Sequence, residues 1–98
     1  MKKYLRDIDI RASGLYMDEK TRIEKDIHMF KENIESTQNH HPEILEDPRA
    51  QMATDYYHDA QYYLEKKDYF TAFGCINYGH GLLDALIKFS DETMEASK

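Results

Sequence analysis

The sequence has no tryptophan, one cysteine and only two prolines. The single cysteine, Cys75, excludes an internal disulfide framework and favours a reducing, cytoplasmic setting. No apolar segment follows the first lysines before charge returns at Arg6, so we expect no secretory signal peptide. The most apolar stretch, residues 69–89, contains several polar side chains. Because these would be costly in a bilayer, we expect neither a membrane span nor a membrane partner.

Basic residues are also scarce: the chain has 13 lysines and arginines but 19 acidic residues, which gives a net charge of −6. A general nucleic-acid binder needs a basic face that displaces counterions from phosphates, so we expect no nucleic-acid partner. Much of the negative charge falls within residues 18–47, where we expect a solvated surface. A content of 41% hydrophobic and 33% charged residues is typical of a folded, soluble domain.

Apolar residues recur at helical spacing, and no segment shows the two-residue alternation of a strand. One apolar stripe, about 120° wide, runs through the first third of the chain. It comprises Leu5, Ile8, Ala12, Leu15, Tyr16, Ile23, Ile27, Phe30 and Ile34. The stripe predicts one long helix over about residues 3–36. A break at Gly14, with Asp18 as a new N-cap, is the alternative.

A polar segment and a strong helix start follow. Residues 37–47 are rich in Asn, His and acid and predict a loop, in which Ile44 and Leu45 plug the end of the core. Asp47 followed by Pro48 is typical of a helix start. The carboxylate can accept from free backbone N–H groups, and the N–H that proline lacks would have no helical partner at this position. We therefore predict a second helix over about residues 48–67.

The third predicted helix begins after Asp68, which is a suitable N-cap, and covers about residues 68–89. Residues 90–98 are polar and are expected to form a tail. The predicted fold class is all-α. Residues 1–98 form a single domain, a three-helix bundle with a long N-terminal helix and an antiparallel hairpin of the second and third helices. Residues 1–17 are an N-terminal extension of this bundle.

The predicted third helix is apolar on nearly every side. Its outward positions are Phe70, Gly74, Tyr78, Gly81, Ala85 and Phe89. Two helices of the same chain can cover only one side, so we expect a second copy or another protein to cover the other. The sequence thus predicts a homodimer or larger homo-oligomer. Its expected interface consists of Leu5, Ile8, Ala12, Leu15, Gly74, Tyr78, Gly81 and Ala85.

Three segments carry a family resemblance: residues 55–60 (DYYHDA), 65–73 (EKKDYFTAF) and 77–85 (NYGHGLLDA). They match the pattern Y-Y-x-D-A, K-x-D-Y-x-x-A and Y-x-H-G-x-x-D, and the chain resembles the archaeal family catalogued as domain of unknown function 357. The likeness extends over about residues 20–90. Members are small helical bundles without an established activity. The resemblance therefore implies a fold and an archaeal cytoplasmic protein, but no function.

The predicted hairpin is also similar to one tetratricopeptide unit and to helical domains of the HEPN type. A single tetratricopeptide unit cannot bury its own apolar face, and about three are normally required. HEPN ribonucleases need an arginine a few residues before the histidine of the last helix. The segment before His80 contains none, which argues against ribonuclease activity.

His80 and Asp84 lie one helical turn apart, and Asp59 could face them across the hairpin. Such a set could hold a divalent metal or orient a general base. The alternative is structural: Asp84 accepts a hydrogen bond from a partly buried imidazole, and Asp59 pairs with another buried donor. Because no further strong ligand occurs at a recognisable spacing, we expect neither a metal nor a cofactor.

The sequence favours a non-enzymatic protein-interaction or scaffold module that self-associates. The alternative function is a small-molecule or metal-binding enzyme with its site around Asp59, His80 and Asp84.

Overall fold

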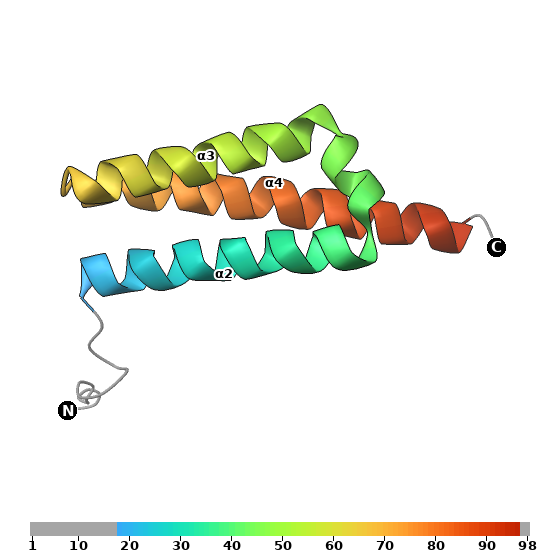
Figure 1. Ribbon diagram of the computed structural model, residues 1–98, viewed down its shortest axis with the longest axis horizontal. Coiled ribbons are helices and arrows are strands. Elements are labelled where there is room, and N and C mark those ends of the chain that lie inside the picture. Colours follow the sequence, from blue (N-terminus) through green and yellow to red (C-terminus); the bar gives the residue numbers. More distant parts are fainter. Residues whose placement is uncertain (1–17, 97–98) are drawn as a thin grey trace, which may run out of the picture.

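A computed structural model describes residues 18–96, with side chains through Ser90. This part of the chain consists of three α-helices, α2 (Glu19–His40), α3 (Pro48–Glu65) and α4 (Tyr69–Ala96), and the short 3-10 helix η2 (Pro42–Glu46). Helices α2 and α4 run in the same direction, and α3 runs opposite to both (Figure 1). The described residues thus confirm the all-α three-helix bundle, in which α3 and α4 form the antiparallel hairpin and make the most extensive contacts.

Helix α2 begins at Glu19 because Asp18 caps it. The backbone of Asp18 is extended, with φ −71° and ψ 168°, and its carboxylate accepts from the backbone N–H of Thr21 at 2.8 Å. The prediction of an unbroken helix over residues 3–36 is therefore wrong, because the chain is not helical at Asp18. The alternative, in which Asp18 is a new N-cap, is confirmed at that residue. Gly14, like the rest of residues 1–17, lies outside the described residues.

Helix α2 also continues four residues beyond the expected end at 36, so the expected loop over residues 37–47 is wrong in part. Residues 37–40 contain neither glycine nor proline, and the hydroxyl of Thr37 donates to the Asn33 carbonyl at 2.8 Å without interrupting the helix. His41 precedes Pro42 and leaves the helical region, with φ −146° and ψ 61°. A residue before proline is biased away from helical backbone, which explains this end.

The remaining loop folds into η2, whose Ile44 is 7% exposed and packs on Leu86 and Ala50. The expected plug at the end of the core is confirmed for this residue. Asp47 then caps α3 by accepting from the backbone N–H of Arg49 at 2.8 Å, as the Asp-Pro pair predicts. Helix α3 ends at Glu65, two residues earlier than expected.

The turn between α3 and α4 is tight. The backbone N–H of Asp68 donates to the Tyr63 carbonyl at 2.9 Å, and that of Lys67 donates to the Leu64 carbonyl at 3.0 Å. With Lys67 in the left-handed region at φ 64°, this is a Schellman ending, which satisfies the last carbonyls of α3. Asp68 in turn caps α4 by accepting from the backbone N–H of Thr71 at 3.2 Å.

Helix α4 continues to Ala96, past the ends of the other helices, so the expected tail over residues 90–98 is wrong through residue 96 (Figure 1). Residues 90–96 lack glycine and proline and include glutamate, methionine and alanine, which favour helix. At 28 residues, α4 is the longest described helix, compared with 22 in α2.

The core lies where the three helices meet. Its largest fully buried side chains are Phe30, Ile23, Ile76 and Leu83. Phe30 stacks on Tyr57 with ring centroids 5.0 Å apart. Helices α3 and α4 approach closely at Gly79, where an added Cβ would lie 3.1 Å from the Ala53 carbonyl oxygen. Met52 of α3 lies outside this core and is 46% exposed.

Candidate functional site

His80 connects two helices. Its ring is half-buried, and Nε2 donates to the backbone carbonyl oxygen of Asp26 in α2 at 2.9 Å. The edge of the ring meets Phe30, with centroids 5.5 Å apart and planes at 79°. A ring nitrogen that donates to a carbonyl is a fixed donor, so this imidazole holds α4 against α2.

The two carboxylates predicted to surround His80 are both exposed. Within the described residues, no hydrogen bond or ion pair joins Asp59 or Asp84 to the imidazole. No group of three or more histidine, cysteine, aspartate or glutamate side chains in the same part of the chain could hold a metal ion. Of the three predicted site residues, His80 therefore forms a hydrogen bond between two helices, and Asp59 and Asp84 are exposed to solvent.

The only thiol is also unsuited to catalysis. Cys75 is half-buried, and this burial raises the pKa of its thiol above the ordinary value. The carboxylates of Asp59 and Asp68 raise that pKa further. Since the thiolate is the nucleophile, a raised pKa keeps Cys75 in its unreactive form near neutral pH.

The most unusual surface lies along the outward side of α4, and we call it the α4 stripe. It comprises Phe70, Gly74, Tyr78, Gly81, Ala85 and Phe89. Phe70 is 90% exposed, Phe89 64% and Tyr78 53%. Gly74, Gly81 and Ala85 are exposed between them, and a Cβ added at either glycine would meet nothing within 4 Å. At 100° per residue, these six uncharged positions span about 100° of the helix. The exposed Lys88 lies at one edge of this sector, in line with Phe70, and the exposed Asp84 lies about 40° beyond the same edge.

The α4 stripe includes the four residues of this helix that the sequence predicted for a partner interface: Gly74, Tyr78, Gly81 and Ala85. All four are exposed, as that prediction requires. The other four predicted interface residues, which are Leu5, Ile8, Ala12 and Leu15, lie outside the described residues.

A shallow hollow lies at each end of the α4 stripe. The first, of about 310 Å³, lies between α2 and α4 and is lined by Glu19, Arg22, Ile23, Tyr69, Phe70 and Phe73. We call it the α2 hollow. The second hollow, of about 340 Å³, lies beside η2. Its apolar lining is Ile44, Leu86 and Phe89, and we call it the η2 hollow.

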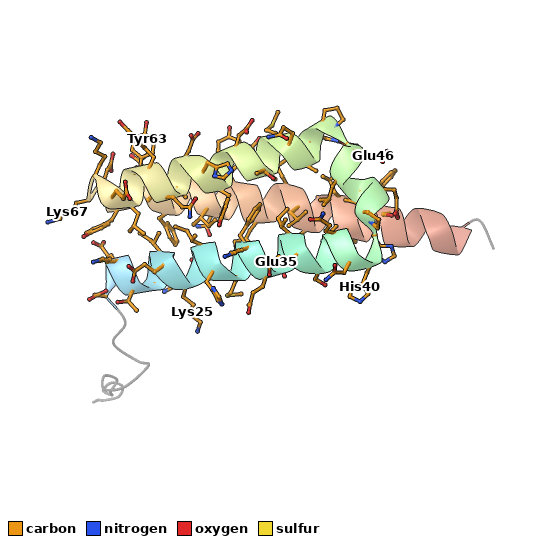
Figure 2. All side chains as sticks on the ribbon, in the orientation of Figure 1. Lys25, Glu35, His40, Glu46, Tyr63 and Lys67 are labelled. Carbon is orange, nitrogen blue, oxygen red and sulfur yellow. The ribbon has the colours of Figure 1, made fainter. Side chains whose placement is uncertain are left out.

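Charged and polar side chains occupy the outer side of α2 instead. Lys25 and His40 project from it away from the bundle (Figure 2). His28 and Glu32 form an exposed pair on the same helix, with Nε2 and Oε2 3.3 Å apart. The bundle therefore has a solvated polar surface on α2 and an apolar surface on α4.

Two residues that take part in these features, Phe73 and Asp26, were not predicted from the sequence. Phe73 is 39% exposed and lines the α2 hollow, and its helical position on the flank next to Phe70 was a signal that could have placed it there. The carbonyl of Asp26, which accepts from His80, had no sequence signal, because every residue carries the same backbone acceptor.

Helices within the described residues are too short or too polar for any of them to cross a membrane.

Comparison with known protein families gives a match. The model of the family described as a protein of unknown function (DUF357) matches residues 25–90, which include the whole α4 stripe, His80 and Asp26. No curated protein and no solved structure matches the chain. Because the family model matches more than half of the 98 residues, the chain belongs to the DUF357 family of unknown function.

Proposed function

We propose that the chain is a non-enzymatic protein-interaction module that self-associates through the α4 stripe. The observation that carries the proposal is Phe70, a large aromatic side chain that is 90% exposed at one end of a row of six exposed, uncharged residues. Single exposed apolar residues are ordinary, but a continuous apolar patch marks an interaction surface.

The stripe glycines support the same proposal. A glycine within a helix costs about 1 kcal/mol relative to alanine. Gly79 has a reason within the chain, because α3 lies against it. Among the described residues, nothing lies within 4 Å of a Cβ added at Gly74 or Gly81, so no neighbour there accounts for these glycines. Close approach of a further helix would supply one, since small residues let helix backbones come together.

The alternative of an enzyme centred on Asp59, His80 and Asp84 has less support. The bond from His80 Nε2 to Asp26 uses the imidazole for packing, and both carboxylates are solvated. Neither hollow is lined by any of the three residues.

The test is the molar mass of the full chain in solution. Size-exclusion chromatography with light scattering is expected to give twice the chain mass at ~50 μM. Phe70→Ser is expected to raise the dissociation constant at least tenfold, as for an aromatic anchor in an interface. Because Phe70 is 90% exposed, the variant should keep the helicity of the parent by circular dichroism.

Tyr62→Ser is the matched control. Tyr62 is 54% exposed but lies on α3, outside the α4 stripe, so its loss should leave the dissociation constant unchanged. A strict monomer at ~50 μM, or equal weakening by both substitutions, would contradict the proposal.

A further inference from the structure

We infer that two copies pair α4 against α4 in antiparallel orientation, about a two-fold axis that passes between residues 79 and 80. This inference rests on the proposed self-association and specifies its geometry. Successive members of the α4 stripe are separated by four, four, three, four and four residues, and this spacing is the same in both directions. A surface with that symmetry presents matching positions to an inverted copy of itself, as an isologous interface requires.

The pairing places small residues where the two helices come closest. Next to the axis, Tyr78 faces the partner's Gly81, whose missing Cβ leaves open space for a ring. One turn further out, Gly74 faces the partner's Ala85. These small residues allow the backbones to approach near the crossing point.

The ends of the stripe fit the same arrangement. Phe70 faces the partner's Phe89, at the positions farthest from the axis. Two crossing helices diverge away from their closest point, so there is room for two large side chains at this distance. Offset or edge-on contact between the two rings would add to the burial of their surface.

The two hollows lie where the pairing would place the aromatic rings of the partner. The α2 hollow lies beside Phe70, where the pairing brings the ring of the partner's Phe89. The η2 hollow lies beside Phe89, where the pairing brings the ring of the partner's Phe70. Each copy thus presents two exposed aromatic rings and two hollows, and the pairing brings each ring beside a hollow of the other copy. Charged side chains also line both hollows, so each ring would contact the apolar part of the lining.

A parallel pair fits less well. It would set each residue of the stripe opposite the same residue of the partner. Tyr78 would then meet another Tyr78 near the middle of the helix, while two copies of Gly81 would leave a gap. The antiparallel pair sets this large residue against a glycine, which is the better packing.

The available area suits a second copy. A fully buried aromatic side chain removes about 150–250 Å² from water, so the exposed parts of Phe70, Phe73, Tyr78 and Phe89 offer roughly 500 Å² per copy. A stable interface of standard size buries about 800 Å² per partner. The four aromatic residues therefore supply most of the area, and the small residues and hollow linings between them are available for the rest.

Disulfide trapping tests the orientation. In a Cys75→Ala background, one chain carries Gly74→Cys and a second, differently tagged chain carries Ala85→Cys. The two are mixed and oxidised mildly. Because a disulfide needs Cα atoms about 4.4–6.8 Å apart, antiparallel pairing predicts the mixed disulfide at least tenfold over either homodisulfide. Lys25→Cys, on the exposed outer side of α2, is the control and should give no preferred product.

The outcomes separate the two proposals. A dimer that yields mainly the Gly74→Cys homodisulfide is parallel, and one that yields no preferred disulfide pairs through another surface. The first result overturns only the antiparallel geometry, whereas the second also overturns self-association through the α4 stripe. A chain that is strictly monomeric at ~50 μM overturns both, and the α4 stripe would then have to bind residues 1–17 or another protein.

Discussion

Replacing glycine by alanine is expected to have opposite effects on stability at Gly79 and Gly81 of α4. At Gly79 an added Cβ would lie 3.1 Å from the Ala53 carbonyl oxygen and 3.5 Å from Phe30 and Tyr56. The nearest atom belongs to the backbone of a packed helix and has little freedom to move. We expect Gly79→Ala to destabilise the fold, because over-packing typically costs about 1–3 kcal/mol and outweighs the gain in helix propensity.

Gly81→Ala is the matched comparison, since an added Cβ at this position meets nothing. It should raise the free energy of unfolding by about 1 kcal/mol through helix propensity alone. Urea unfolding followed by circular dichroism, in a Phe70→Ser background that suppresses association, measures both. Equal stabilities of the two variants would show that α3 and α4 are not held as close as the structure has them.

The role of His80 can be tested against its predicted carboxylate partner. We expect His80→Ala to lower the free energy of unfolding by about 1–2 kcal/mol, because it removes the bond to Asp26 and the contact with Phe30. Asp84→Ala should be nearly neutral, as Asp84 is exposed. A double-mutant cycle that couples His80 and Asp84 by more than about 0.5 kcal/mol would instead support a His–Asp pair.

At the residue scale, periodicity predicts burial well and partners poorly. Helical spacing alone puts Ile23, Ile27 and Phe30 on one apolar stripe, and the structure has all three in the core. The same spacing makes His80 and Asp84 neighbours, yet His80 donates to a carbonyl of another helix. A backbone acceptor has no residue type, so its position depends on how the helices are packed and cannot be predicted from the sequence.

At the scale of the element, the cap of α3 gives a pH dependence. The Arg49 side chain and backbone N–H donate to the carboxylate of Asp47, and these bonds lower the pKa of Asp47 from 3.8 to about 2. Because the folded state lowers this pKa, the ionised cap stabilises the fold above about pH 4. The stabilisation is lost as the pH falls from 4 through about 2.

Asp47→Asn isolates this contribution. The amide oxygen can still accept from the Arg49 backbone, but it cannot ionise, so the substitution removes the charged pair. Thermal unfolding should show the parent more stable than the variant near neutral pH. The difference in melting temperature should shrink below pH 4 and be mostly lost by about pH 2. A constant difference from pH 2 to pH 7 would contradict the charged cap.

Helix starts were more predictable than helix ends for a physical reason. A start needs a side-chain acceptor at one position, and Asp47 and Asp68 provide it in the sequence as in the structure. An end without glycine or proline has no local signal. The helices therefore run on to His40 and Ala96, because no residue before those positions interrupts them.

At the scale of the whole molecule, the sequence predicted an excess of apolar helix surface, and the α4 stripe is that excess. The hollows beside it could not be predicted, because each is lined by residues of separate elements. The α2 hollow combines Ile23 of α2 with Phe73 of α4, and the η2 hollow combines Ile44 with Phe89. Only the register between elements decides whether such residues leave a space between them.

The charge of the molecule predicts how salt should act on self-association. Each copy carries −6, whereas the α4 stripe contains no charge, so two copies repel at long range and attract through an apolar contact. The Debye length falls from about 30 Å at 0.01 M salt to about 3 Å at 1 M, so added salt screens the repulsion. We expect the dissociation constant, measured by sedimentation equilibrium, to fall several-fold between ~0.01 M and ~0.5 M sodium chloride. The Tyr62→Ser control should follow the same trend, because it changes neither the net charge nor the stripe. A dissociation constant that rises with salt would mean that ion pairs, and not the aromatic rings of α4, hold the copies together.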